Sequence, residues 1–145
     1  MLEQKYLIDA NVLFNAFISG KEFFNLLFSQ CQIYIPDFAF PELEKYKFRI
    51  LKKTKLSESE FRDYVMRLFK NVTVIPKLLL SQNLLETAYK ICKQVDEKDT
   101  VYIATAMEFD LTLITSDKKL YKGLQSRGFN RIIQLSEIVN ILYDR

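Results

Sequence analysis

Short apolar runs alternate with longer stretches of helical periodicity along the whole chain, and this alternation predicts an α/β fold. The runs are rich in β-branched residues, as expected for strands of a parallel sheet covered on both faces. We expect five strands, at residues 6–8, 32–35, 72–75, 112–115 and 131–135. The stretches between them predict helices at residues 11–18, 22–30, 37–54, 57–70, 81–94, 97–109, 117–127 and 136–143.

Several helix ends carry local signals. Ser57 with Glu60 forms a capping-box pattern, and Ser81 and Ser136 each precede a helical stretch. Gly128 fits a glycine at a helix C-terminus. The helices between residues 37 and 70 read as a hairpin that stands off the sheet. The pattern as a whole predicts one domain over residues 1–145, a three-layer α/β/α sandwich with a central, mostly parallel five-stranded sheet and this added helical hairpin.

The composition restricts the chemistry mainly through a residue type that is missing, because the 145 residues include no histidine. Ser/His/Asp triads, Cys/His pairs and the common histidine-containing zinc sites are therefore excluded. Cys31 and Cys92 are too few for a four-cysteine zinc site, and their apolar neighbours predict buried or half-buried thiols. Catalysis would depend on carboxylates, hydroxyls, lysines or a hard metal ion.

The remaining composition is typical of a globular domain. With 49% hydrophobic and 27% charged residues, the chain is neither disordered nor membrane-like, and its length is sufficient for a core without disulfides. An early charge argues against a signal peptide, and no apolar run approaches the roughly 20 residues of a membrane helix. We expect a cytoplasmic protein without a membrane partner. The formal charge of +3 does not by itself indicate nucleic-acid binding.

Acidic residues from distant parts of the chain are predicted to meet at one edge of the sheet. Asp9 and Asp117 each follow a predicted strand, and open α/β sheets bind ligands at the carboxyl ends of their strands. Asp99 heads the apolar face of its helix, with Asp96 three residues before it on the same side. Glu42 also borders apolar neighbours, where a carboxylate is costly unless it is compensated.

Each acid alone has a simpler interpretation. Asp9 and Asp117 fit helix N-caps. Asp96 and Asp99 fit the preference of a helix N-terminus for negative charge, and Glu42 fits a solvated contact with a helical neighbour. Capping does not require acids from distant segments at one edge, however. Clustered carboxylates raise one another's pKa values unless a divalent cation lies among them, and oxygen ligands favour Mg²⁺ or Mn²⁺. The sequence therefore predicts an acidic metal site.

The residues around these acids resemble the successive motifs of PIN domains, the PilT N-terminal type. The motifs are Leu7 to Leu13, Pro41 to Leu43, Asp96 to Thr100 with Ala104 to Ala106, and Leu113 to Asp117. The resemblance spans nearly the whole chain. It implies a parallel-sheet α/β/α fold with an acidic cleft that binds Mg²⁺ or Mn²⁺, and typically a metal-dependent ribonuclease. Many small members are VapC-like toxins of toxin–antitoxin modules, usually homodimeric and inhibited by a cognate antitoxin protein.

The resemblance also implies roles for individual residues. The family's four catalytic acids match Asp9, Glu42, Asp99 and Asp117, and Asp96 matches an extra acid of some members. All five are candidate metal ligands, with Glu42 binding directly or through water. The candidates for positioning water or phosphate are Asn11, Thr115 and Ser116. In the implied reaction, the metal orients and activates a water that hydrolyses an RNA phosphodiester bond.

Basic and aromatic residues provide candidate contacts with partners. Basic side chains follow Glu42 and Asp117, so both groups are expected to adjoin the acidic edge. The candidates for RNA or antitoxin contacts are Lys45, Arg49, Lys52, Lys53 and Lys118. A basic helix face is equally typical of an ordinary solvated surface. Five phenylalanines between residues 14 and 28 exceed one buried face, and so indicate a homodimer or a partner groove.

The main alternative function is a PIN-fold module that binds RNA or protein without cutting. Such a module needs no complete acid set, whereas all four matching acids are present here. A haloacid-dehalogenase phosphatase is disfavoured because its second aspartate is replaced by Asn11, and a response regulator because Ile75 is followed by Pro76. The sequence therefore favours a Mg²⁺- or Mn²⁺-dependent endoribonuclease, the toxin of a type II toxin–antitoxin module.

Overall fold

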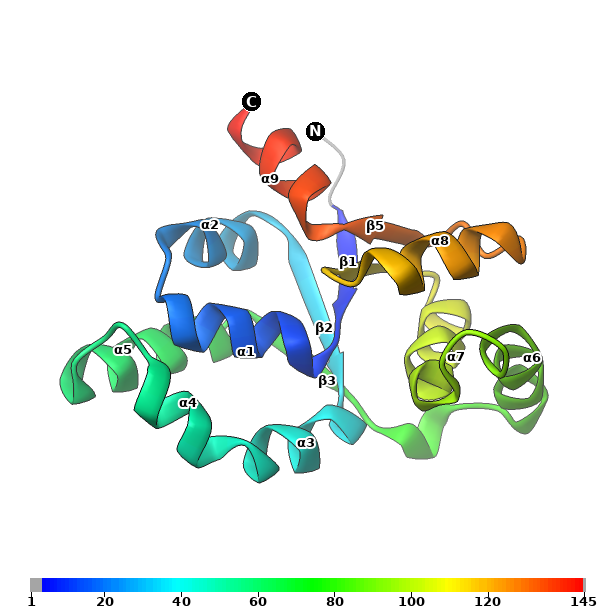
Figure 1. The fold of residues 1–145 in the computed structure, drawn as a ribbon, viewed down its shortest axis with the longest axis horizontal. Helices are drawn as coiled ribbons and strands as arrows, with labels where there is room; N and C mark the ends of the chain where they lie inside the picture. Colours follow the sequence, from blue (N-terminus) through cyan, green and yellow to red (C-terminus); the bar gives the residue numbers. More distant parts are fainter. Residues whose placement is uncertain (1–3, 145) are drawn as a thin grey trace.

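A computed structural model describes residues 4–144, and its centre is a five-stranded sheet in the order β3-β2-β1-β4-β5 (Figure 1). Every neighbouring pair of strands is parallel. The strands are β1 (Lys5–Ile8), β2 (Gln32–Pro36), β3 (Val72–Ile75), β4 (Thr112–Thr115) and β5 (Ile132–Gln134). All five predicted strands are confirmed to within one residue at each end.

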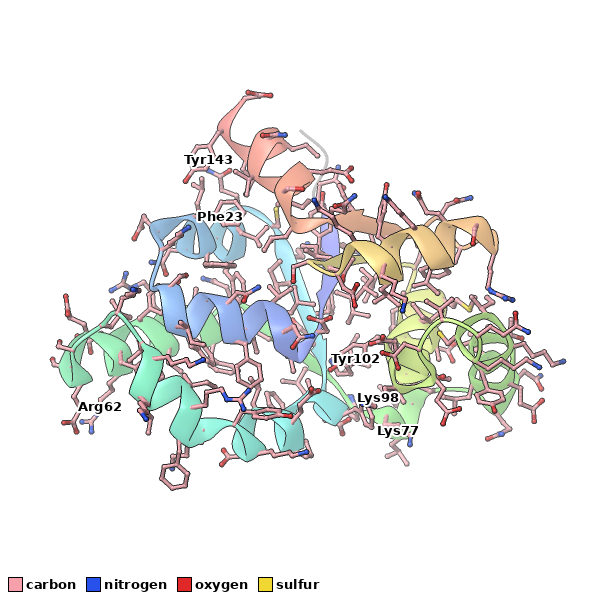
Figure 2. All side chains as sticks on the ribbon, in the orientation of Figure 1. Phe23, Arg62, Lys77, Lys98, Tyr102 and Tyr143 are labelled. Carbon is pink, nitrogen blue, oxygen red and sulfur yellow. The ribbon has the colours of Figure 1, made fainter. Side chains whose placement is uncertain are left out.

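Helices cover both faces of the sheet, so the predicted α/β/α sandwich is confirmed (Figure 1). One face is covered by α1 (Ala10–Ser19), α2 (Glu22–Gln30), α3 (Phe40–Lys45), α4 (Lys47–Lys53) and α5 (Glu58–Phe69). The other face carries α6 (Gln82–Cys92), α7 (Thr100–Phe109) and α8 (Lys118–Ser126). The last helix, α9 (Leu135–Tyr143), returns to α2, where the rings of Phe23 and Tyr143 lie 6.1 Å apart (Figure 2).

Most of the predicted helix ends are confirmed. Ser57 and Glu60 form a complete capping box, and the Ser81 hydroxyl accepts a hydrogen bond from the Leu84 N–H group at 3.3 Å. Gly128 follows α8 with a φ of +85°, which favours glycine. Ser136 does not begin the last helix, because β5 passes directly into α9 at Leu135.

The stretch from residue 37 to residue 54 is not the single helix that its periodicity predicts. It forms a 3-10 turn, η1 (Asp37–Ala39), then α3 and α4, which are separated at Tyr46. The Tyr46 ring meets Phe14 of α1 edge-on, with centroids 5.1 Å apart. After this break, α4 packs against α1. The Thr54 hydroxyl, just after α4, donates a hydrogen bond to the Phe17 carbonyl of α1 at 2.7 Å. The hairpin between residues 37 and 70 therefore packs on α1 and α2.

The arrangement of β1 and β4 creates a crevice at the carboxyl edge of the sheet. These strands are neighbours, but the chain leaves β1 towards α1 on one face and leaves β4 towards α8 on the other. Ligands of open α/β sheets bind at such a switch point. Asp9 and Asp117 lie within these two connections, as the N-caps of α1 and α8, so the fold brings both carboxylates to the crevice.

Two further predictions concern apolar segments. Phe17, Phe23, Phe24 and Phe28 are buried and Phe14 packs partly buried against the core, so these aromatic residues contribute to this chain's own core. Cys92 is buried and Cys31 is half-buried, as expected. Across residues 4–144, no helix combines the length and apolar character needed to cross a membrane.

Candidate active site

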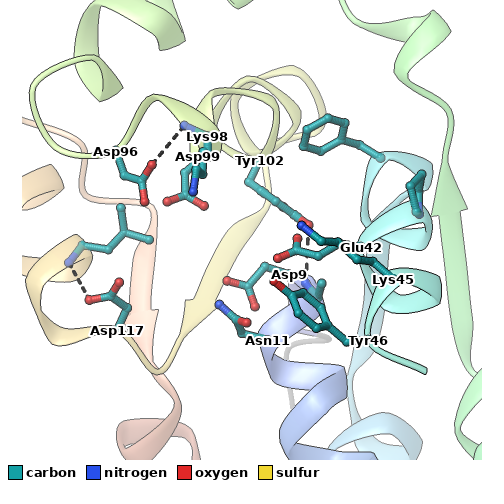
Figure 3. Close-up of a pocket in the computed structure, with 14 residues that line it drawn as sticks. Asp9, Asn11, Glu42, Lys45, Tyr46, Asp96, Lys98, Asp99, Tyr102 and Asp117 are labelled. Atoms are coloured by element: carbon teal, nitrogen blue, oxygen red, sulfur yellow. Dashed lines mark hydrogen bonds between the residues drawn. The ribbon is translucent and has the colours of Figure 1, made fainter. Parts of the chain in front are cut away.

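The five predicted acids line one open cavity of about 520 Å³ at the carboxyl edge of the sheet (Figure 3). They come from four separate segments: the end of β1, helix α3, the 3-10 turn η3 (Glu97–Asp99) and the start of α8. The lining carboxylates are Asp9, Glu42, Asp96, Asp99 and Asp117. The structure therefore brings together every acid that the sequence pattern selected.

Asp9 is the most buried of these carboxylates, with 6% of its surface exposed. It occupies the N-cap position of α1, where its Oδ1 accepts a hydrogen bond from the Val12 N–H group at 3.0 Å. The pKa of Asp9 is raised to about 6, mainly by burial and in smaller part by the negative charge of Glu42, while the hydrogen bond from Val12 opposes the shift. Asp9 therefore caps a helix, and burial in the cavity destabilises its ionised form.

Asp99 lies half-buried immediately before α7, and its carboxylate has no capping bond to that helix. Burial raises the pKa of Asp99 to about 7, and the charges of the four other carboxylates add to the shift, that of Asp96 most strongly. The structure confirms that Asp99 heads the inward side of its helix. The negative charges of all four other carboxylates therefore disfavour ionisation of Asp99.

The other three acids are exposed. Asp117 caps α8 by accepting from the Leu120 N–H group at 3.0 Å, and Asp96 caps η3 by accepting from the Lys98 N–H group at 3.1 Å (Figure 3). The capping interpretation is thus confirmed for Asp117, as it is for Asp9, and Asp96 lies at a helix N-terminus as expected. Glu42 borders apolar neighbours as expected, because Ala39 is buried and Leu43 packs partly buried against the core, but Glu42 itself is exposed.

The three predicted positioning residues are arranged differently from one another. Asn11 is exposed on the first turn of α1 and lines the cavity. Thr115 is buried at the end of β4, and its hydroxyl accepts a hydrogen bond from the Asp117 N–H group at 3.0 Å. The cavity lining contains neither Thr115 nor Ser116. Thr115 consequently shapes the turn that presents Asp117.

Several cavity residues were not predicted as site residues, among them Tyr102, Lys98 and Phe38. The buried Tyr102 hydroxyl accepts a hydrogen bond from the Ala10 N–H group at 3.4 Å, and burial raises its pKa. Lys98 and Phe38 also line the cavity (Figure 3). Tyr102 follows Asp99 by three residues, and this helical spacing was the available signal.

The basic residues predicted to contact RNA or an antitoxin differ in whether they line the cavity. Lys45 lines the cavity, and the Arg49 guanidinium lies 5.0 Å from the centre of the Tyr46 ring. The prediction that Lys52 and Lys53 adjoin the acidic edge is wrong. They lie at the end of α4, next to the C-terminal half of α1, and α1 extends about 15 Å from Asp9. Lys118 is exposed directly after Asp117, but it does not line the cavity.

The donor set fits a hard divalent cation. Carboxylate oxygens are the ligands that Mg²⁺ and Mn²⁺ prefer. Burial, and after it the negative charges of the neighbouring carboxylates, raise the pKa of Asp99, and a cation would relieve the repulsion among those charges. Within residues 4–144, no three acidic or thiol side chains are gathered tightly enough to hold a metal ion in their present positions. Binding would therefore require the exposed carboxylates to move towards Asp9 and Asp99.

The PIN domain family model matches residues 7–137, so the chain belongs to the PIN domain family. No curated protein matches the chain.

Three solved structures share its fold. PAE2754 from Pyrobaculum aerophilum is 13% identical, with a TM-score of 0.65 over 98% of this chain and 91% of that one. A toxin–antitoxin complex from Klebsiella pneumoniae is 20% identical, with a TM-score of 0.58 over 88% and 95%. VapBC2 from Rickettsia felis, bound to a DNA fragment from its promoter, is 15% identical, with a TM-score of 0.60 over 90% and 97%.

Proposed function

We propose that this PIN domain is a Mg²⁺- or Mn²⁺-dependent endoribonuclease. The observation that carries the proposal is the convergence of five carboxylates from four segments on one cavity, together with the raised pKa of Asp99. Strongly perturbed acids in a cleft are typical of functional sites. A module that only binds RNA would have no use for two desolvated carboxylates, because their burial costs folding free energy.

The residues divide into roles by their burial and charge. When bound, the cation would neutralise charge on the reacting phosphate and make a water molecule acidic. Asp9 and Asp99, the two least exposed carboxylates, form the floor of the cavity and would hold the cation. The exposed Asp96 and Asp117 would move towards it. Glu42, exposed at the mouth, would orient the attacking water and accept its proton, directly or through a second water.

Uncharged and basic side chains would place the substrate. Lys45 and Lys98 line the cavity from different segments, and their ammonium groups would bind non-bridging phosphate oxygens. Asn11 would donate a hydrogen bond to the water or phosphate. Tyr102, whose hydroxyl accepts from the Ala10 N–H group, would hold the start of α1, and therefore Asp9, in place.

Cleavage of a labelled single-stranded RNA by the purified protein tests this proposal. The wild type should cut with Mg²⁺ or Mn²⁺ and not with EDTA. Asp9→Asn retains an oxygen for the helix cap but loses the charge, and should reduce kcat at least about 100-fold. Asp63→Asn, which changes an exposed acid on α5, is the matched control and should cut like the wild type. Cleavage that survives EDTA or Asp9→Asn would refute the proposal.

We also infer that the chain is the toxin of a toxin–antitoxin module. The support is the fold shared with the Klebsiella pneumoniae toxin–antitoxin complex and with Rickettsia felis VapBC2. Induced expression of the wild type should arrest growth, whereas Asp9→Asn should not. Co-expression of the product of a small neighbouring gene should restore growth and yield a stable complex with this chain. Light scattering of the purified protein would test the proposed homodimer.

A further inference from the structure

Phe38 is an aromatic residue exposed beside the acidic cavity. It lies in η1 directly after β2, lines the cavity and has 40% of its surface exposed. The next exposed apolar residues along this side belong to the 3-10 turn η2 (Lys77–Leu79), which follows β3, and Leu78 is 91% exposed. Exposing large apolar groups to water is unfavourable, and a patch next to a functional cleft indicates a binding surface.

Groups from two other segments, α7 and η2, contact the Phe38 ring. The ring of Tyr102 meets it edge-on, with centroids 6.1 Å apart and an interplanar angle of 71°. The Lys77 ammonium lies 5.8 Å from the centre of the ring. The Lys77 N–H group donates a hydrogen bond to Asp37 Oδ1 at 3.0 Å, which ties η2 to η1. Tyr102 and Lys77 lie on the same side of the molecule as Lys98 (Figure 2). The ring is therefore oriented and accompanied by a cation.

We propose that Phe38 stacks against a base of single-stranded RNA next to the phosphate that is cut, and that Lys77 binds a neighbouring phosphate. Sites for single-stranded nucleic acid combine aromatic platforms for bases with basic groups along the backbone. Here the aromatic ring and the cation are in contact, and the ring lines the same cavity as the acids. The lysine head group is exposed and can turn from the ring to a phosphate.

This inference rests on the proposed ribonuclease function, and it makes a more specific claim about the substrate. The nucleotide beside the cut must be unpaired, because a base inside a duplex cannot stack on a side chain. The enzyme should therefore cut loops and single strands in preference to double-stranded stems of the same sequence.

The test combines kinetics with a spectroscopic signal. Phe38→Ala should raise KM for a single-stranded RNA about tenfold and leave kcat within about twofold. Phe38→Trp should restore KM, and Phe38→Leu, which keeps the apolar contact with Tyr102, should not. In the Asp9→Asn background, 2-aminopurine placed beside the cut should lose fluorescence on binding, and Phe38→Ala should abolish this quenching. Phe48→Ala, at an 82% exposed phenylalanine on α4, is the control and should match the wild type.

The outcomes separate the two proposals. If the wild type does not cut RNA, the proposed function fails and the stacking role fails with it. If the wild type cuts, and Phe38→Ala or Phe38→Leu has the wild-type KM and quenching, only the stacking role is refuted. If Phe38→Ala weakens the complex with the antitoxin and leaves RNA binding unchanged, Phe38 contacts a protein and the stacking role is again refuted.

Discussion

The floor and the rim of the acidic cavity place the same chemical group in two different environments. On the floor, Asp9 is buried and Asp99 is half-buried, and burial raises both pKa values. On the rim, Asp96, Glu42 and Asp117 are exposed. Negative charge is thus costly on the floor and well solvated on the rim. In the proposed site, we therefore expect the floor to bind the cation and the rim to adapt to it.

If the proposed site is correct, the floor would also couple cation binding to proton release. With pKa values of about 6 and about 7, Asp9 and Asp99 retain part of their protons in the absence of metal near neutral pH. A cation binds the ionised carboxylates and displaces those protons. Binding should therefore tighten as the pH rises through this range.

The largest expected effect is a difference in kcat between a variant of the floor and a variant of the rim. Asp99→Asn should lower kcat for RNA cleavage by about 100- to 10,000-fold, because it removes a floor ligand. Asp96→Asn retains the capping oxygen towards Lys98 and should lower kcat by about tenfold or less. Steady-state kinetics of both variants at saturating Mn²⁺ provide the comparison. Equal losses in the two variants would show that the floor has no special role.

The next effect concerns stability without metal. The folded-state pKa of Asp9 lies above its ordinary value of 3.8, so the ionised form destabilises the fold. The penalty is absent below about pH 4 and complete above about pH 6, where it amounts to about 3 kcal/mol. Relative to the wild type, Asp9→Asn should therefore become more stable as the pH rises through this window.

Urea unfolding in EDTA at a series of pH values measures this difference. Asp63→Asn, on the exposed surface of α5, should parallel the wild type at every pH. A difference between Asp9→Asn and the wild type that does not change between pH 4 and pH 7 would mean that the Asp9 carboxylate is not strained.

A slightly smaller effect should follow from adding the cation at pH 8. Because the unfolded chain has no assembled site, Mn²⁺ at 100 times its Kd should raise the free energy of unfolding by about 2.7 kcal/mol. A Asp9→Asn, Asp99→Asn double variant should show little of this gain, whereas Asp96→Asn should retain most of it. Thermal unfolding with increasing Mn²⁺ is the measurement, and an equal gain in the double variant would place the cation elsewhere.

The smallest effect applies the comparison to the basic residues. Lys98→Glu places a negative charge in the cavity and should raise KM for RNA about tenfold at low salt. The combined variant Lys52→Glu, Lys53→Glu should change KM less than about threefold, because these lysines lie at the far end of α4. A larger effect of the α4 pair would mean that RNA extends along α4.

Local sequence information was sufficient for the sheet and for most of the site. Asp9 directly follows an apolar strand and Asp117 follows another by two residues, and this position alone places them at the carboxyl edge. The break at Tyr46 was not predictable, because helical periodicity continues through it and a contact with Phe14 accompanies the turn. The error at Lys52 and Lys53 follows from that break. Tyr102 was missed because its hydroxyl meets Ala10, 92 residues away in sequence.

Asp9 and Asp117 each cap a helix and line the cavity, and these two roles together restrict the substitutions that evolution can accept at both positions. Each carboxylate accepts the hydrogen bond that starts a helix, so a substitution that removes the oxygen damages folding as well as the site. A substitution at position 9 or 117 that removes the charge should therefore be best tolerated by the fold when it introduces asparagine, serine or threonine. Descendants that have lost activity but remain folded should carry these residues at positions 9 and 117, and should rarely carry alanine or valine.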